Sequence, residues 1–200
     1  GVKQETLVIS FLNELVRTPA AGLDAAITRV LGRMGELCEA DRAYVFLFRH
    51  DEVMNNTHEW VADGVQPMRA RLQNQPIDII SSWRKTLDND EVVHIADVAA
   101  LPANTPEKPV LEMQDILSVV TVPILVDGKL VGLAGLDRTR QKAPFPDESI
   151  ALLRGVADVI QSALMRKEAL QDLERTKTKL ELTLAALPDL LLEVDHDGIY

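Results

Sequence analysis

The sequence predicts an α+β fold, in which a central antiparallel sheet is flanked by helices and a long helix forms the C-terminal end. Apolar residues keep helical spacing over residues 6–17 and 22–39, and a β-strand pattern follows. Two apolar runs flank the pair Asp127 and Gly128, which favours a tight hairpin turn because glycine accepts a positive φ. A long proline-free stretch then ends at Pro188, which indicates one extended helix.

The composition describes a soluble globular chain of 200 residues, of which 46% are hydrophobic and 26% are charged. This length favours one main domain. The formal net charge of -10 repels phosphate backbones, so we expect no nucleic acid partner. No apolar run approaches the roughly 20 residues of a membrane-spanning helix, and residues 1–16 lack the features of a signal peptide. We therefore expect a cytoplasmic region without membrane contact.

The first part of the chain predicts two amphipathic helices, over residues 6–17 and about 22–39. The segment RAYVFLFR (42–49) is apolar at both alternating sets of positions, which is typical of a strand covered on both faces. The segment HDEVMNN is predicted as a turn, and THEWVAD (57–63) as the antiparallel partner strand.

The middle of the chain is less regular. A helix is predicted around IDIISSWRKTL (77–87) and a short strand at EVVHIAD (91–97). Three prolines indicate a loop over residues 98–109, before a short helix at VLEMQDI. The segment SVVTVPILVDGKLVGLAGLD (118–137) then predicts the β-hairpin.

The long helix begins near Asp147 and carries a heptad pattern. From residue 166 onward, charged residues surround a narrow apolar stripe that a monomer leaves exposed. We therefore predict a parallel two-stranded coiled coil over residues 166–186, and hence a homodimer. Arg166 and Lys177 are the polar interruptions of this seam. The predicted seam residues are Val156, Val159, Ala163, Leu170, Leu173, Leu180, Leu184 and Leu187.

The order of these elements resembles a GAF domain. The segments that carry the resemblance are CEADRAYVFLF, THEWVADGV, QDILSVVTVPILVDGKLVGLAGLD and FPDESIALLRGVADVIQSAL. They are similar to the helix-to-strand junction, the second strand, the hairpin and the final helix of bacterial sensory GAF domains. The resemblance covers residues 6–165 and implies a GAF-like sheet in the sensor region of a signalling protein.

The final segment, LAALPDLLLEVDHDGIY, is similar to the start of a PAS domain. Pro188 is expected to end the long helix, and Asp195, Asp197 and Gly198 supply turn residues between two strands. We therefore assign residues 187–200 to a truncated PAS domain. Chains with a GAF domain, a helix and a PAS domain in series end in a histidine kinase or diguanylate cyclase module, so the resemblance implies one of these as the output.

The sequence gives little support for catalysis in this region itself. It contains no G-x-S-x-G motif, phosphate-binding glycine loop or H-E-x-x-H motif. A lone Cys38 lies on the apolar stripe of the second helix and is expected to be buried, with a redox enzyme that uses Cys38 as the alternative. The four histidines, His50, His58, His94 and His196, are expected to be structural. The alternative is a metal or haem site that uses His58 or His94.

The GAF resemblance also bears on cofactors. GAF domains that carry linear tetrapyrroles attach them through a cysteine elsewhere in the fold, and the GAF-type methionine sulfoxide reductases need several cysteines. The cyclic-nucleotide-binding members carry an N-K-x-F-x-D-E motif, which is absent from this sequence. The sequence therefore assigns no cofactor.

The resemblance places a ligand pocket between the sheet and an irregular helical insertion, which here is residues 64–117. Aromatic walls with a few polar groups suit a small organic ligand. The candidate lining residues are Phe46, His58, Trp60, Trp83, Ser118 and Thr121. The alternative is a ligand-free GAF module that serves only dimerisation, with Trp60 and Trp83 filling the core.

Overall fold

The computed structural model describes the backbone of residues 2–196 and the side chains of residues 2–187. It divides into two compact units, Gly1–Gln161 and Ser162–Tyr200. The first unit contains the sheet and the shorter helices. Helix α5 (Asp147–His196) begins in the first unit and forms the described part of the second. No described helix is both long enough and apolar enough to cross a membrane.

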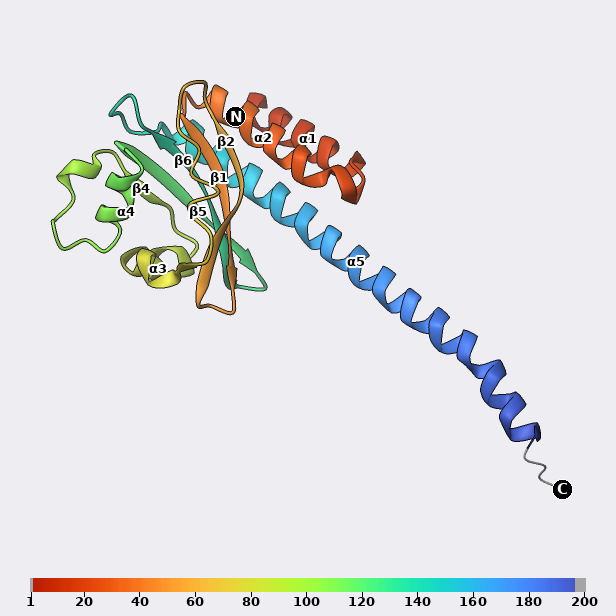
Figure 1. Ribbon diagram of the computed structural model, residues 1–200. Helices are drawn as coiled ribbons and strands as arrows, with labels where there is room; N and C mark the ends of the chain where they lie inside the picture. Colours follow the sequence, from red (N-terminus) through yellow and green to blue (C-terminus); the bar gives the residue numbers. More distant parts are fainter. Residues whose placement is uncertain (1, 197–200) are drawn as a thin grey trace. The chain divides into compact units, whose positions relative to one another are not determined.

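The first unit is built on a six-stranded antiparallel sheet, which confirms the predicted fold class. In spatial order the strands are β3-β2-β1-β6-β5-β4, and Figure 1 shows the sheet with helices on both sides. Their bounds are β1 (Arg42–Arg49), β2 (Val53–Val61), β3 (Gln75–Pro76), β4 (Val93–Ile95), β5 (Ser118–Val126) and β6 (Lys129–Arg138). Strand β2 begins earlier than predicted, because residues 53–56 of the expected turn pair with β1.

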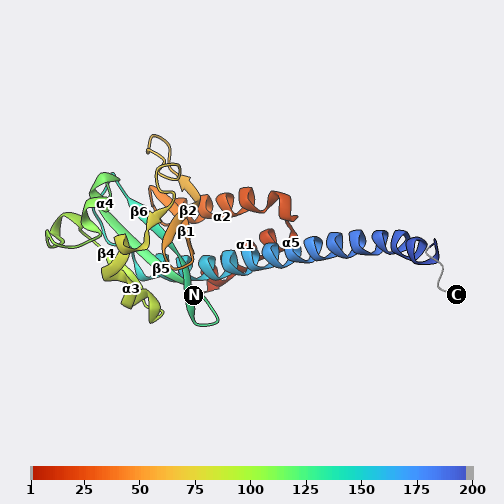
Figure 2. The ribbon, with the colours of Figure 1, turned by 60° about the horizontal axis from the view of Figure 1, so that its bottom comes forward.

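Helices cover both faces of the sheet (Figures 1 and 2). Helix α2 packs on β1 and β2, and α1 packs against α2. The opposite face carries α3 and α4 from the insertion, residues 64–117. The helices of this unit are α1 (Val2–Arg17), α2 (Leu23–Leu37), α3 (Ser81–Asp88) and α4 (Lys108–Met113), with 3-10 turns at Ala20–Gly22, Ile77–Ile80 and Val98–Ala100.

The α2 face of the sheet is tightly packed around Trp60. A Cβ added to Gly35 would lie 2.4 Å from the indole ring, and one added to Gly32 would lie 2.9 Å from it. Real Cβ atoms do not approach other atoms so closely. The two glycines of α2 therefore let the helix approach β2 with the Trp60 ring between them.

The first turns of α5 belong to the core of the first unit. Val156 and Val159 are buried within the chain, and Ala163 is buried as well. Val156 and Val159 are therefore already covered within the first unit, which argues against their predicted place in a dimer seam. The assignment of Ala163, which lies in the second unit, stays a prediction. The physical reason is that residues 150–160 are apolar on more than one side, so packing within the first unit also covers the heptad positions there.

Helix α5 also differs from the prediction at its C-terminal end. It continues past Pro188 to His196, although Pro188 predicts an end of the helix at that position. A strand at residues 190–194 needs a neighbouring strand for its backbone hydrogen bonds, and the described residues offer none there. Residues 197–200 lie outside the described residues, and the assignment of residues 187–200 to a PAS domain stays a prediction.

Candidate functional site: a cavity beneath the helical insertion

A cavity of about 50 Å³ lies between the sheet and the insertion. The sheet contributes Tyr44, Phe46 and Leu133, and α3 and α4 contribute Trp83 and Leu111. Nearly all of its lining is apolar. The remaining lining residues are Met54, Leu72, Gln75, Ile79, Ile80, Glu107, Val110, Gln114, Ile116 and Thr121.

Three of the six predicted pocket residues line this cavity. Phe46 and Thr121 reach it from β1 and β5, and Trp83 reaches it from α3. The cavity thus lies between the sheet and the insertion, where the GAF resemblance places a ligand pocket. Whether a ligand occupies it stays a prediction.

His58 and Trp60 lie on the opposite face of the sheet, and a β-bulge explains the difference. Val45 pairs with His58 and Phe46 pairs with Asn56, so Thr57 has no partner in β1. One extra residue reverses the alternation of side chains along the strand. Met54 therefore faces the cavity. His58 instead contacts Asp24 of α2, with 2.9 Å between Nε2 and Oδ1, and Trp60 packs on α2.

Ser118 is also outside the cavity. It lies three residues from Thr121 on β5, and an odd separation along a strand places two side chains on opposite faces. Its hydroxyl donates to the carbonyl oxygen of Ala96 at 2.7 Å and accepts the N–H of Ala143 at 3.1 Å. Ser118 therefore ties the end of β4 to the segment that leads into α5.

Glu107 joins the two halves of the insertion. Its fully buried carboxylate accepts the N–H and the hydroxyl of Ser82 at 2.8 and 2.5 Å, and the N–H of Trp83 at 3.3 Å. These N–H groups belong to the first turn of α3, where backbone donors have no partner within the helix. A residue just before α4 thus caps α3 and holds Trp83 against the cavity.

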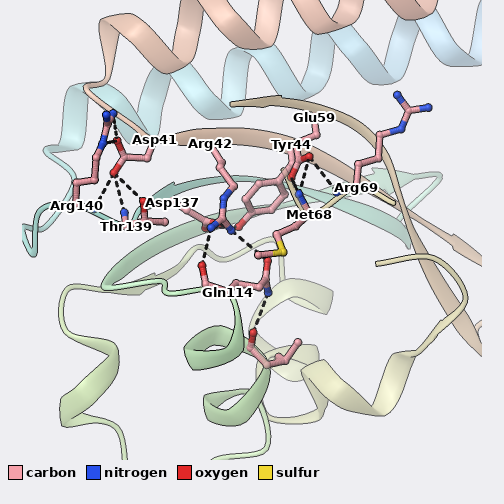
Figure 3. A network of polar contacts seen from close by, with 11 residues as sticks. Asp41, Arg42, Tyr44, Glu59, Met68, Arg69, Gln114, Asp137, Thr139 and Arg140 are labelled. Carbon is pink, nitrogen blue, oxygen red and sulfur yellow. Dashed lines mark hydrogen bonds and ion pairs between the residues drawn. The ribbon is translucent and has the colours of Figure 1, made fainter. Parts of the chain in front are cut away.

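A buried polar network (Figure 3) includes two residues that line the cavity, Tyr44 and Gln114. The guanidinium of Arg42 donates to the backbone oxygen of Gln114 at 2.5 Å and lies 3.6 Å from an oxygen of Asp137. The hydroxyl of Tyr44 donates to Asp137 at 2.8 Å. A Cβ on Gly135 would lie 2.5 Å from that hydroxyl oxygen, so the glycine leaves room for the ring. The network joins β1 and β6 to the end of α4.

Burial changes the acid–base properties of this network. It raises the pKa of the Asp137 carboxyl to about 7, although the charge of Arg42 and the hydrogen bond from Tyr44 act in the opposite direction. Burial and the neighbouring Asp137 raise the pKa of Tyr44 well above its ordinary value. Tyr44 is therefore a neutral hydrogen-bond donor, and Asp137 titrates in the neutral range.

Two further carboxylates hold loops at the margin of the sheet (Figure 3). Asp41 accepts the N–H groups of Thr139 and Arg140 at 2.7 and 3.0 Å. Glu59 accepts the N–H groups of Met68 and Arg69 at 3.0 and 2.9 Å. Glu59 therefore anchors the beginning of the insertion to β2.

The insertion also contacts α5. Arg154 of α5 donates to the Asp90 carboxylate at 3.1 Å and to its backbone oxygen at 2.6 Å. Asp90 follows the last turn of α3, and it adopts a positive φ of 59°. Helix α3 therefore lines the cavity through Trp83 and is held to α5 through Asp90.

The other reactive side chains have structural partners. Cys38 is buried, as predicted, and burial raises the pKa of its thiol. The Nε2 atom of His94 accepts the N–H of Phe145 at 3.0 Å, and partial burial lowers the pKa of the imidazole. Among the described residues, no three or more His, Cys, Asp or Glu side chains form a group that could hold a metal ion.

Sequence reasoning missed Glu107 and the network of Arg42, Tyr44, Gln114 and Asp137. Glu107 lies in a segment with three prolines, which the analysis interpreted as a simple loop. Arg42 and Asp137 occur in otherwise apolar strands, and that contrast is a usable signal because buried charges require partners. The pair Gly32 and Gly35 in α2 was a second signal, since two glycines on one helix allow a close approach of the element that packs on it.

Comparison with known proteins gives a consistent result. Residues 22–164 match the family model of the GAF domain. The Methanogenesis regulatory histidine kinase FilI of Methanothrix harundinacea (strain 6Ac) is 30% identical over 164 residues, which are 80% of this chain and 18% of the relative. The chain thus spans about a fifth of that protein's length.

Solved structures show the same fold. The phycocyanobilin-bound GAF domain of a cyanobacterial phytochrome superposes with a TM-score of 0.69 at 19% identity, covering 83% of this chain and 96% of that chain. The photosensory core module of the Stigmatella aurantiaca phytochrome gives a TM-score of 0.71 at 16% identity, and the match covers 94% of this chain and 41% of that chain. At these identities the likeness concerns the fold alone.

Proposed function

The chain belongs to the GAF domain family, and on this premise we propose that it is the regulatory sensor region of a signal-transduction protein. A small molecule enters the cavity beneath the insertion, and the change in packing is passed to α5. The similarity to a regulatory histidine kinase supports this role. A histidine kinase is accordingly the favoured output, with a PAS domain between it and α5 and a diguanylate cyclase as the other output.

The contact between α3 and α5 is the observation that carries the proposal. Trp83 and Asp90 are on or directly after the same short helix, and one lines the cavity while the other binds Arg154. A ligand that displaces Trp83 must shift α3, and a shift of α3 changes the geometry at Arg154. A ligand can change the equilibrium of α5 only through such a difference in contacts between two states.

Loss of this contact is expected to uncouple α5 from the cavity. In the otherwise unchanged chain, Trp83→Leu should loosen α3 and increase amide hydrogen exchange in residues 147–158 several-fold. In an Arg154→Ala background the increase should disappear, as measured by mass spectrometry of the exchanged peptides. An exposed ion pair of this kind contributes only about 0–1 kcal/mol, so global unfolding does not explain such an effect.

The matched control for this experiment is Arg175→Ala. Arg175 is also on α5, is exposed, and pairs with Asp172 in the same helix. Its loss should leave the response to Trp83→Leu intact. An unchanged response in the Arg154→Ala background would show that the relay does not run through Asp90.

We propose that the second unit transmits the signal as a dimer. The remaining seam residues Leu170, Leu173, Leu180, Leu184 and Leu187 are all exposed. They keep the heptad positions of a parallel coiled coil, and a second copy of the same helix would cover them. The exposed apolar stripe over residues 166–186 therefore favours a coiled coil there, whereas the seam positions over residues 156–163 are buried.

Replacement of two central seam residues is expected to give a monomer. Leu173→Asn together with Leu180→Asn places two amides in the seam, so sedimentation of the 200-residue chain at high micromolar concentration should change from dimer to monomer. Leu182 is an equally exposed leucine off the seam, and Leu182→Asn should remain dimeric. A monomeric parent chain, or dissociation by Leu182→Asn, would contradict the proposed seam.

A second candidate function is a ligand-free dimerisation module, and the size of the cavity favours it. Pockets for drug-sized ligands occupy about 300–1,000 Å³, whereas this cavity measures about 50 Å³. A bilin, as in the similar cyanobacterial domains, would require α3 and α4 to move apart. The sensor proposal therefore requires either that movement or a ligand much smaller than a bilin.

A further inference from the structure

Thr121 lines the apolar cavity and carries a buried polar atom without a partner. The residue is 1% exposed, and its Oγ1 has no hydrogen-bond partner within the described part of the protein. A buried hydroxyl is normally paired, and one that is not must be explained. Thr121 is also one of the residues that line the cavity.

The charged group nearest the cavity is already fully engaged. Both carboxylate oxygens of Glu107 accept hydrogen bonds from the first turn of α3, from Ser82 and Trp83. A ligand anion would lie beside this buried negative charge without a cation of its own, which is costly in a medium of low dielectric constant.

The polar groups of the network are committed as well. The Tyr44 hydroxyl donates to Asp137. The Gln114 side chain donates from its amide nitrogen to the oxygen of Val110 at 2.9 Å, and its amide oxygen faces Arg42 at 3.4 Å. Gln75, which is only partly buried, donates from its amide nitrogen to the backbone oxygen of Gln73 at 3.0 Å. Among the lining residues, the Thr121 hydroxyl is therefore the buried polar group that has no partner within the described residues, and a ligand can engage it without breaking a contact.

Cavity volume sets the size of the ligand. One water needs about 10–15 Å³ and an engineered cavity of about 150 Å³ accepts benzene, so the 50 Å³ measured here suits a molecule of about four non-hydrogen atoms. We propose that the cavity takes an uncharged molecule of this size, whose single polar group hydrogen-bonds to the Thr121 hydroxyl. This inference rests on the proposed sensor function and specifies its ligand class.

A set of probes of matched size tests the ligand class. Xenon reports on the cavity alone, and acetone adds one hydrogen-bond acceptor to an apolar body. Acetate and isopropylammonium have as many non-hydrogen atoms as acetone and carry a negative and a positive charge. Binding to the 200-residue chain is followed by xenon NMR and by the methyl resonances of Ile79, Ile80, Leu111 and Thr121.

We expect xenon and acetone to bind, the latter with a millimolar dissociation constant because so few atoms contribute. Acetate and isopropylammonium should bind at least about tenfold more weakly than acetone. Thr121→Val removes the hydroxyl at nearly constant shape, so it should weaken acetone about tenfold and leave xenon binding unchanged. It should not destabilise the chain, because the lost hydroxyl has no partner in the protein. The control is Thr28→Val. Thr28 belongs to α2, which packs on the other face of the sheet, so this variant should bind both probes as the parent chain does.

The outcomes separate this inference from the function on which it rests. Failure of xenon to bind would show that the cavity is not accessible, and would overturn the ligand-binding function together with this inference. Binding of xenon with equal binding of acetone and either charged probe would overturn the inference alone. So would acetone binding that is unaffected by Thr121→Val.

Discussion

Replacement of Glu107 by alanine is expected to lower the free energy of unfolding by about 3 kcal/mol, because it leaves buried N–H groups without acceptors. Glu107 is fully buried and accepts three hydrogen bonds from Ser82 and Trp83. Its loss removes the cap of α3 and the connection between the two halves of the insertion. Urea denaturation, monitored by tryptophan fluorescence, measures the change.

Two variants control this result. Glu107→Gln keeps one oxygen acceptor in place and should lose about half as much stability. Glu112 is an exposed glutamate on α4, with an ion-pair distance of 3.9 Å to Lys108. Glu112→Ala should change stability by less than about 0.5 kcal/mol. Equal effects of Glu107→Ala and Glu112→Ala would show that the cap does not hold the insertion.

The stability of the chain is expected to fall as the pH rises through 7, because of Asp137. Its pKa is about 7 in the folded protein against a reference value of 3.8. The folded state therefore binds this proton more tightly, so the contribution is complete below pH 3.8 and is lost as the pH rises through about 7. Between pH 5 and 8 the expected loss is about 2 kcal/mol.

Asp137→Asn tests this interpretation. The amide resembles the protonated carboxyl and does not titrate. The stability of the variant relative to the parent chain should therefore increase steadily from pH 5 to pH 8. The charged and titratable groups around Asp137 are Arg42, Tyr44, Glu59 and Asp41. They remain in the variant, and the difference between the two pH profiles isolates Asp137.

Other groups that titrate in this range cancel in the same difference. His94, whose pKa is lowered, gives a slope of the opposite sign, since its contribution is lost as the pH falls. Urea denaturation of both chains at intervals between pH 5 and 8 supplies the profiles. Parallel profiles over this range would show that Asp137 is ionised in the folded protein throughout.

Local patterns in the sequence were sufficient for the elements of the fold. Strand β1 and the hairpin around Asp127 and Gly128 have alternating or apolar runs bounded by turn residues, and the structure confirms them. Helical spacing likewise predicted α1 and α2. These signals are local, because each depends on neighbouring residues that share one face or one turn.

The composition of the cavity was decided only by the tertiary structure. An extra residue at Thr57 reverses the faces of β2, so His58 and Trp60 turn toward α2 and Glu59 turns toward the insertion. A bulge depends on the register between two strands, which no single segment specifies. In the same way, Val156 and Leu173 share a heptad register, but packing within the first unit buries Val156, whereas Leu173 is exposed.

By itself, the sequence determined the order of the elements and the family to which the chain belongs. Only the tertiary structure decided which residues face the cavity, that Glu107 fastens α3 and α4 together, and that Asp90 meets Arg154. The reason is physical: periodicity reports how a segment divides its apolar and polar sides, whereas a site is made of side chains from segments distant in the sequence. Their meeting depends on strand register, on bulges and on the space that glycines leave, and these are properties of the assembled fold.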